Sequence, residues 1–81
     1  MKDFVASFHT HLSALMTDRA LKAEGITSRM APVPRKLSSS CGTCVLYTAP
    51  QACLEHLDAD TERVWEIIGP EQYRLIWENE E

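Results

Sequence analysis

The fold is decided by residues 4–31, which read FVASFHTHLSALMTDRALKAEGITSRMA. The opening Phe4–Phe8 predicts a β-strand, because apolar, β-branched and aromatic residues fit a pleated, half-buried surface. A helix over His11–Glu24 follows, with Thr10 able to cap its first turn. Gly25 ends this helix, since glycine adopts the left-handed conformation found beyond helix C-termini.

Two prolines separate this start from the rest of the chain. We expect a second strand over Ile26–Ala31, which Pro32 and Pro34 end because proline has no N–H to donate to a neighbouring strand. A loop over residues 35–42 then leads into a third strand, Cys44–Tyr47. The pattern therefore predicts strand, helix, strand, loop and strand in that order.

The second half of the chain continues the alternation. Thr48 can cap a second helix whose first turn holds Pro50, where a missing N–H costs nothing, and which ends near Thr61. Two apolar and aromatic runs, Arg63–Ile68 and Tyr73–Trp77, flank turn residues and predict a β-hairpin. A helical continuation through residues 61–77 is the alternative that the sequence leaves open.

These elements define one α+β domain over residues 1–81. The order β-α-β-β-α-β is that of the ferredoxin-like split β-α-β sandwich, which we expect to place two helices on one face of a single sheet. The C-terminal hairpin adds an extra strand at one edge. A homodimer formed through this hairpin stays open.

Size and charge exclude several classes of function. The chain has 81 residues and a formal net charge of −4 at pH 7. A domain this small has little room for a deep substrate cavity, which favours a carrier or accessory protein over a self-sufficient enzyme. The acidic balance argues against a nucleic-acid partner, and no run approaches the roughly 20 apolar residues of a membrane helix. Without a secretory signal pattern, we expect no membrane partner and a cytoplasmic location.

The chemistry of the chain is concentrated at Cys41 and Cys44, two thiols three residues apart. A cysteine reacts as its thiolate, which neighbouring cations and backbone N–H groups favour. Arg35 and Lys36 precede the pair and supply positive charge. Three cysteines in a reducing compartment indicate metal, redox or covalent-carrier chemistry rather than a disulfide framework.

The residues beside the thiols can form an anion-binding turn. Ser39 and Ser40 offer hydroxyls and consecutive backbone N–H groups, and Gly42 permits a tight backbone conformation. His9, at the end of the first strand, is a candidate to hydrogen-bond this loop. In this arrangement Cys41 is the accessible thiol and Cys44 a second, resolving nucleophile.

Several of these motifs resemble those of a known family. Segments at matching spacing are similar to those of the selenium/sulfur carrier-like family of small bacterial and archaeal proteins. They are Phe8-His9-Thr10, Ala23-Glu24-Gly25-Ile26, Pro32-Val33-Pro34-Arg35 and Ser38-Ser39-Ser40-Cys41-Gly42. The resemblance implies that Cys41 holds sulfur or selenium as a persulfide or selenosulfide-type adduct, with no firmly implied cofactor beyond this cargo. It also implies a donor such as a desulfurase-like enzyme, and an acceptor protein.

Other functions stay open for the same region. A soft-metal module would bind Cu(I) or Zn(II) through Cys41 and Cys44. A dithiol redox protein would oxidise the pair reversibly, although such pairs commonly start a helix and this one leads into a predicted strand. A plain interaction domain, which adds a partner strand at an exposed sheet edge, is a further alternative.

Overall fold

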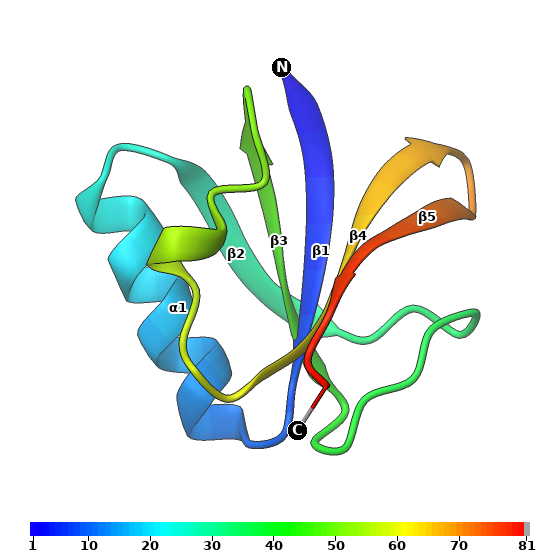
Figure 1. Ribbon diagram of the computed structural model, residues 1–81, viewed down its shortest axis with the longest axis horizontal. Helices are drawn as coiled ribbons and strands as arrows, with labels where there is room; N and C mark the ends of the chain where they lie inside the picture. Colours follow the sequence, from blue (N-terminus) through cyan, green and yellow to red (C-terminus); the bar gives the residue numbers. More distant parts are fainter. Residues whose placement is uncertain (81) are drawn as a thin grey trace.

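The computed structural model describes residues 1–80, which form five strands, one α-helix and one 3₁₀ turn (Figure 1). The α+β class is confirmed, and so is the C-terminal hairpin, whereas the helical alternative for residues 61–77 is wrong. In chain order the elements are β1 (Lys2–Phe8), α1 (His11–Ala23), β2 (Thr27–Pro32), β3 (Thr43–Ala49), the 3₁₀ turn η1 (Leu54–His56), β4 (Thr61–Gly69) and β5 (Gln72–Glu78).

The strands form one antiparallel sheet in the order β2-β3-β1-β4-β5. β3 therefore separates β1 from β2, and β1 separates β3 from β4, so each of the two crossovers spans one intervening strand. The first crossover carries α1, but the second carries only η1. The prediction of a second helix is wrong, and residues 1–80 do not form the two-helix layer of a ferredoxin-like sandwich.

Long-range strand pairing explains why the second helix does not form. Thr48 pairs with Asp3 of β1, and its hydroxyl donates to the Asp3 carboxylate at 2.7 Å instead of capping a helix. Further along, Cys53 has a φ of 53°, a left-handed conformation that interrupts a right-handed helix. The Tyr47 hydroxyl also donates to the carbonyl oxygen of Ala52, which fastens this segment to β3.

The first part of the chain folds as its sequence predicts. Thr10 is the N-cap of α1, and its hydroxyl accepts a hydrogen bond from the Ser13 N–H at 3.2 Å. Gly25, with a φ of 78°, follows the end of the helix. Pro32 is the last residue of β2, an edge strand. Within residues 1–80 no helix is long and apolar enough to cross a membrane.

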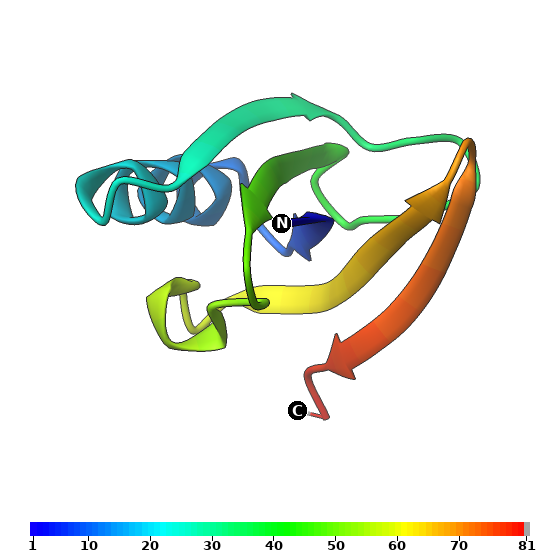
Figure 2. The ribbon, with the colours of Figure 1, turned by 90° about the horizontal axis from the view of Figure 1, so that it is seen from above.

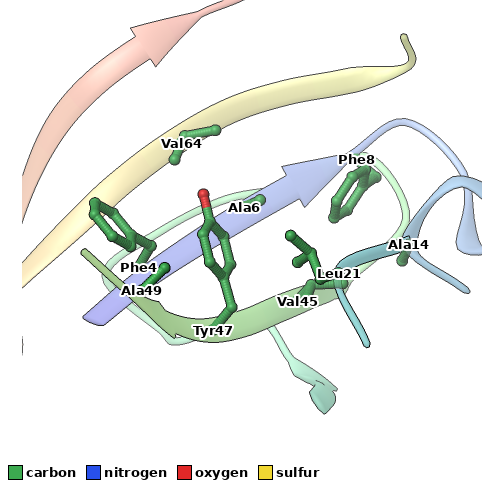
Figure 3. Packing of buried hydrophobic residues seen from close by; sticks show 9 residues of the cluster. All are labelled: Phe4, Ala6, Phe8, Ala14, Leu21, Val45, Tyr47, Ala49 and Val64. Atoms are coloured by element: carbon green, nitrogen blue, oxygen red, sulfur yellow. The ribbon is translucent and has the colours of Figure 1, made fainter. Parts of the chain in front are cut away.

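Buried side chains form two clusters, which alternation along the strands places on opposite faces of the sheet. Figure 2 shows α1 and η1 on one side of the sheet and the long loop that follows β2 on the other. Val33 and Leu37 of this loop pack on that far side, whereas Cys41, at the end of the loop, packs against the helix-side cluster. In the helix-side cluster, the rings of Phe4 and Tyr47 stack with centroids 5.2 Å apart (Figure 3). The loop-side cluster consists of Val5, Cys44 and Trp65. The helix-side cluster consists of Phe4, Ala6, Phe8, Ala14, Leu21, Val45, Tyr47, Ala49 and Val64.

Candidate functional site

Cys41 lies in a turn that leads from the long loop into β3. The next residue, Gly42, has a φ of 74°, a left-handed conformation that glycine adopts without strain. A Cβ at this position would meet no atom within 4 Å, so the backbone conformation rather than space requires glycine. The Gly42 carbonyl also accepts a hydrogen bond from the Val33 N–H at 3.1 Å, which closes the base of the loop. The tight turn expected from Gly42 is present.

The Cys41 thiol is free and partly exposed at the rim of the helix-side cluster. Its S–H donates to the carbonyl oxygen of Thr43, with the sulfur 3.5 Å away, and the Ser39 hydroxyl lies 3.8 Å from the sulfur. That hydroxyl donates its own proton to the carbonyl oxygen of Phe8 at 2.9 Å, so no proton of Ser39 is directed at the sulfur. The thiol proton is thus bound by Thr43, and a sulfur anion here would draw the Ser39 proton away from Phe8.

A carboxylate that the sequence analysis did not single out holds this turn. Glu62 accepts hydrogen bonds from the Ser40 N–H at 3.0 Å and from the Ser40 hydroxyl at 2.7 Å. Its carboxylate also lies 3.3 Å from Nδ1 of His9. Burial raises the pKa of Glu62, but the Ser40 hydrogen bonds and the nearby His9 outweigh it, so the pKa lies below its ordinary value. Glu62 is thus an ionised anchor at neutral pH.

Glu62 reaches the turn because β4 carries one extra residue at this point. The pairing of β1 with β4 shifts register, so that Ser7 lies opposite Arg63 and Phe8 opposite Thr61, which leaves Glu62 between the two pairs. A β-bulge of this kind bends its strand and redirects a side chain, and bulges are over-represented beside functional sites. No local sequence signal announces it, since it arises from the pairing of two strands far apart in the chain.

Cys44 lies in a different environment although it is only three residues away. It is fully buried in the loop-side cluster, beside Val5 and Trp65. Its S–H donates to the carbonyl oxygen of Pro32 at 3.7 Å. Burial raises the pKa of the Cys44 thiol to about 11, against a smaller opposing effect of Arg29. The structure therefore does not present Cys44 beside Cys41 as a second accessible nucleophile.

The two cations expected beside the thiol lie at the far end of the loop. Arg35 and Lys36 are the central residues of a turn over residues 34–37, which a backbone hydrogen bond of 3.0 Å closes. Lys36 lines a surface hollow together with Glu71, from the turn between β4 and β5. Figure 2 shows the loop extending toward that turn. The structure thus places these cations at the loop tip and Cys41 at the loop base.

Two histidines lie near the base of the turn: His9 in the link between β1 and α1, and His11 at the start of α1. His9 contacts Glu62 rather than the loop itself, so its expected link to the cysteine loop is indirect. His11 places Nδ1 3.3 Å from the Thr43 hydroxyl. Within residues 1–80, however, no group of three or more His, Cys, Asp or Glu side chains is arranged to hold a metal ion.

The remaining thiol, Cys53, lies in the segment that precedes η1, away from the turn. It is free and partly exposed, and its S–H donates to the carbonyl oxygen of Gln51 at 3.3 Å. Burial and the nearby Glu55 raise the pKa of this thiol. Cys53 is therefore a useful internal reference for the reactivity of Cys41.

The Cys41 turn and the elements around it lie within a part of the chain that is similar to known proteins. A family described as "Putative Se/S carrier protein-like" matches residues 3–67. The chain belongs to this family. It is also 40% identical over 50 residues to "Uncharacterized protein YtiA" from Escherichia coli strain K12, a match that covers 62% of this chain and 59% of that relative. No solved structure matches. The resemblance found in the sequence is confirmed, and β5 lies beyond the matched residues.

Proposed function

We propose that this protein carries sulfur or selenium on Cys41, as a persulfide or selenosulfide-type adduct, and passes the cargo to an acceptor protein. The observation that carries the proposal is the state of Cys41, which is a free, partly exposed thiol. Hydrogen bonds of Ser39 and Ser40, the two residues before it, hold its turn in place. A carrier thiol has to be reachable, and it has to be held in a defined place for its partners. The name of the family supports the same role.

Loading and unloading then exchange one chalcogen atom between thiolates. The Cys41 thiolate attacks the terminal sulfur of a donor persulfide, a new S–S bond forms at Cys41, the donor S–S bond breaks and the donor thiolate leaves. In unloading, a nucleophile of the acceptor attacks the outer atom of the adduct, and Cys41 leaves as its thiolate. The electrons balance in each step, so neither step needs an oxidant or a reductant. The same exchange applies when selenium is the outer atom.

The residues around Cys41 have distinct roles in this proposal. Ser39 turns its hydroxyl from Phe8 toward the outer, anionic atom of the adduct, as hydroxyl donors do toward anions. Gly42 sets the backbone of the turn. Because Cys44 is buried and its pKa is raised to about 11, the proposed release uses the acceptor's nucleophile rather than Cys44.

The proposal includes a donor, such as a desulfurase-like enzyme, an acceptor protein and a cytoplasmic location. It describes a non-catalytic carrier, because the turn presents one thiol, Cys41, and the neighbouring Cys44 is buried. A two-thiol metal module and a dithiol redox protein both need two sulfurs presented together. No observation on Cys41 and Cys44 favours either of them.

Loading tests the proposal. The purified chain is incubated with a cysteine desulfurase and cysteine, and the products are mapped by peptide mass spectrometry. We expect the mass of one added sulfur atom in the wild type, in Cys44→Ser and in Cys53→Ser, and none in Cys41→Ser. Selenocysteine in place of cysteine tests the selenium cargo. An adduct that persists in Cys41→Ser contradicts the proposal.

A further inference from the structure

The contacts of Glu62 assign a role to a residue that no sequence motif marks. We infer that Glu62 is the positioning residue of the Cys41 turn: its carboxylate binds Ser40 and thereby keeps the adjacent thiol against the rim of the helix-side cluster. The inference rests on the proposed function only in taking Cys41 as the reactive thiol.

The geometry allows the Glu62 side chain to hold Ser40 firmly. One carboxylate accepts both the backbone N–H and the hydroxyl of Ser40, at 3.0 and 2.7 Å. Hydrogen bonds to an ionised acceptor are shorter and stronger than those between neutral groups. The Glu62 side chain is 12% exposed, so water competes weakly for its oxygens, and the more exposed His9 ring lies 3.3 Å from the same carboxylate. The next residue, Arg63, does not compete for the carboxylate, because it pairs with Glu78.

The turn is closed mainly by polar contacts at the surface. Ser40 is exposed and bound by Glu62 of β4, while Ser39 is bound by the Phe8 carbonyl at the end of β1. These two tethers act on the two residues immediately before Cys41. A closure of this kind opens without disrupting a buried apolar core, as expected of segments at the low end of local stability. Loss of the Glu62 tether therefore frees one side of the turn and exposes the Cys41 sulfur.

Site-resolved alkylation with iodoacetamide tests this role. We expect Glu62→Ala to raise the rate at Cys41 about tenfold, a change that corresponds to roughly 1.4 kcal/mol and to the net worth of about one hydrogen bond. Glu62→Gln, which keeps one carbonyl oxygen as an acceptor, should give a smaller rise. Glu66→Ala is the matched control, because Glu66 is another sheltered carboxylate of β4 but pairs with Arg74. It should leave the Cys41 rate unchanged.

Cys53 reports general loosening in the same samples. An unchanged Cys41 rate in Glu62→Ala, or an equal rise at Cys53, would overturn the inference. If Glu62→Ala does not fold, Ser40→Ala replaces it, since this variant removes the 2.7 Å bond and keeps the 3.0 Å bond. We then expect a several-fold rise at Cys41 and faster hydrogen exchange at the residue-40 amide. Alkylation needs no cargo, so this result is independent of whether Cys41 accepts sulfur.

Discussion

Two thiols three residues apart occupy opposite sides of this sheet. Cys41 is partly exposed in a turn held by side-chain hydrogen bonds, whereas Cys44 is fully buried beside Val5 and Trp65. Cys41 precedes β3 in the turn, whereas Cys44 is the second residue of β3, where alternation along the strand directs its side chain into the loop-side cluster. On a helix the same spacing would place both thiols on one face. The spacing of two cysteines therefore acquires its meaning from the element that carries it.

The largest expected effect is on the relative reactivity of these two thiols. With iodoacetamide at neutral pH, we expect Cys41 of the native wild type to react about a thousandfold faster than Cys44. Such a ratio corresponds to a free energy of roughly 4 kcal/mol for the local opening that exposes the Cys44 sulfur to the reagent. Peptide mass spectrometry gives both rates, and the urea-unfolded chain is the control in which they should converge. Native rates within a few-fold of each other would contradict the contrast.

Alkaline pH should weaken the folded state through Cys44. Its pKa is raised from 9.0 to about 11, so the folded protein keeps this proton when the unfolded chain has lost it. Unfolding then releases a proton, and the stability present below pH 9 is lost as pH rises through 11, by roughly 2–3 kcal/mol in total. Tyr47, whose pKa burial also raises, adds to the loss in the same direction.

Urea unfolding at a series of pH values, in the wild type and in Cys44→Ala, measures this effect. Tyr47 is common to both proteins, so the difference between their pH profiles reports Cys44 alone. The variant should lose less stability between neutral pH and pH 11. Parallel profiles would mean that the Cys44 side chain is not sheltered in solution.

Gly42 and Gly25 allow a matched test of the turn. Both have positive φ, at 74° and 78°, and a Cβ on either would meet no atom within 4 Å. Replacement of either glycine by alanine should therefore lower the free energy of unfolding by a similar amount, about 1–2 kcal/mol, from backbone strain alone. Only Gly42→Ala should change the alkylation rate of Cys41. An equal change in Gly25→Ala would show that the turn does not control the thiol.

The smallest effect concerns Ser7, which pairs with Cys44 across β1 and β3. Its hydroxyl is buried without a hydrogen-bond partner in residues 1–80. Because an unsatisfied buried polar group is costly, Ser7→Ala should leave the free energy of unfolding unchanged or raise it by up to about 1 kcal/mol. Ser13→Ala is a suitable contrast, since the Ser13 hydroxyl donates to Asp60 at 2.9 Å. A loss of stability in Ser7→Ala would show that the Ser7 hydroxyl makes a stabilising hydrogen bond, which would contradict this expectation.

Local signals predicted the first part of this fold well. The cap at Thr10, the glycine after α1 and the strands on either side depend on residues close in sequence, and each appears where expected. The second helix failed because its capping signal at Thr48 was overridden by pairing with Asp3, far away in the chain. Propensity is a weak prior when a strand partner competes for the same residues.

The site was predictable only in part for a related reason. Cys41 and Gly42 belong to one turn, so the sequence could place them together. Glu62 enters through a bulge that depends on the register between β1 and β4, and no local pattern specifies it. Arg35 and Lys36 are near Cys41 in sequence, but the turn over residues 34–37 carries them to the loop tip.

The central claim is that Cys41 is the sulfur atom that holds the cargo. One measurement tests it most directly: the wild type is loaded by a desulfurase, and the added chalcogen is assigned among the three cysteines in a single digest. We predict that the adduct is confined to Cys41, with Cys44 and Cys53 unmodified. An adduct on Cys53 in equal amount, or a chain that takes up no cargo at all, would contradict the account.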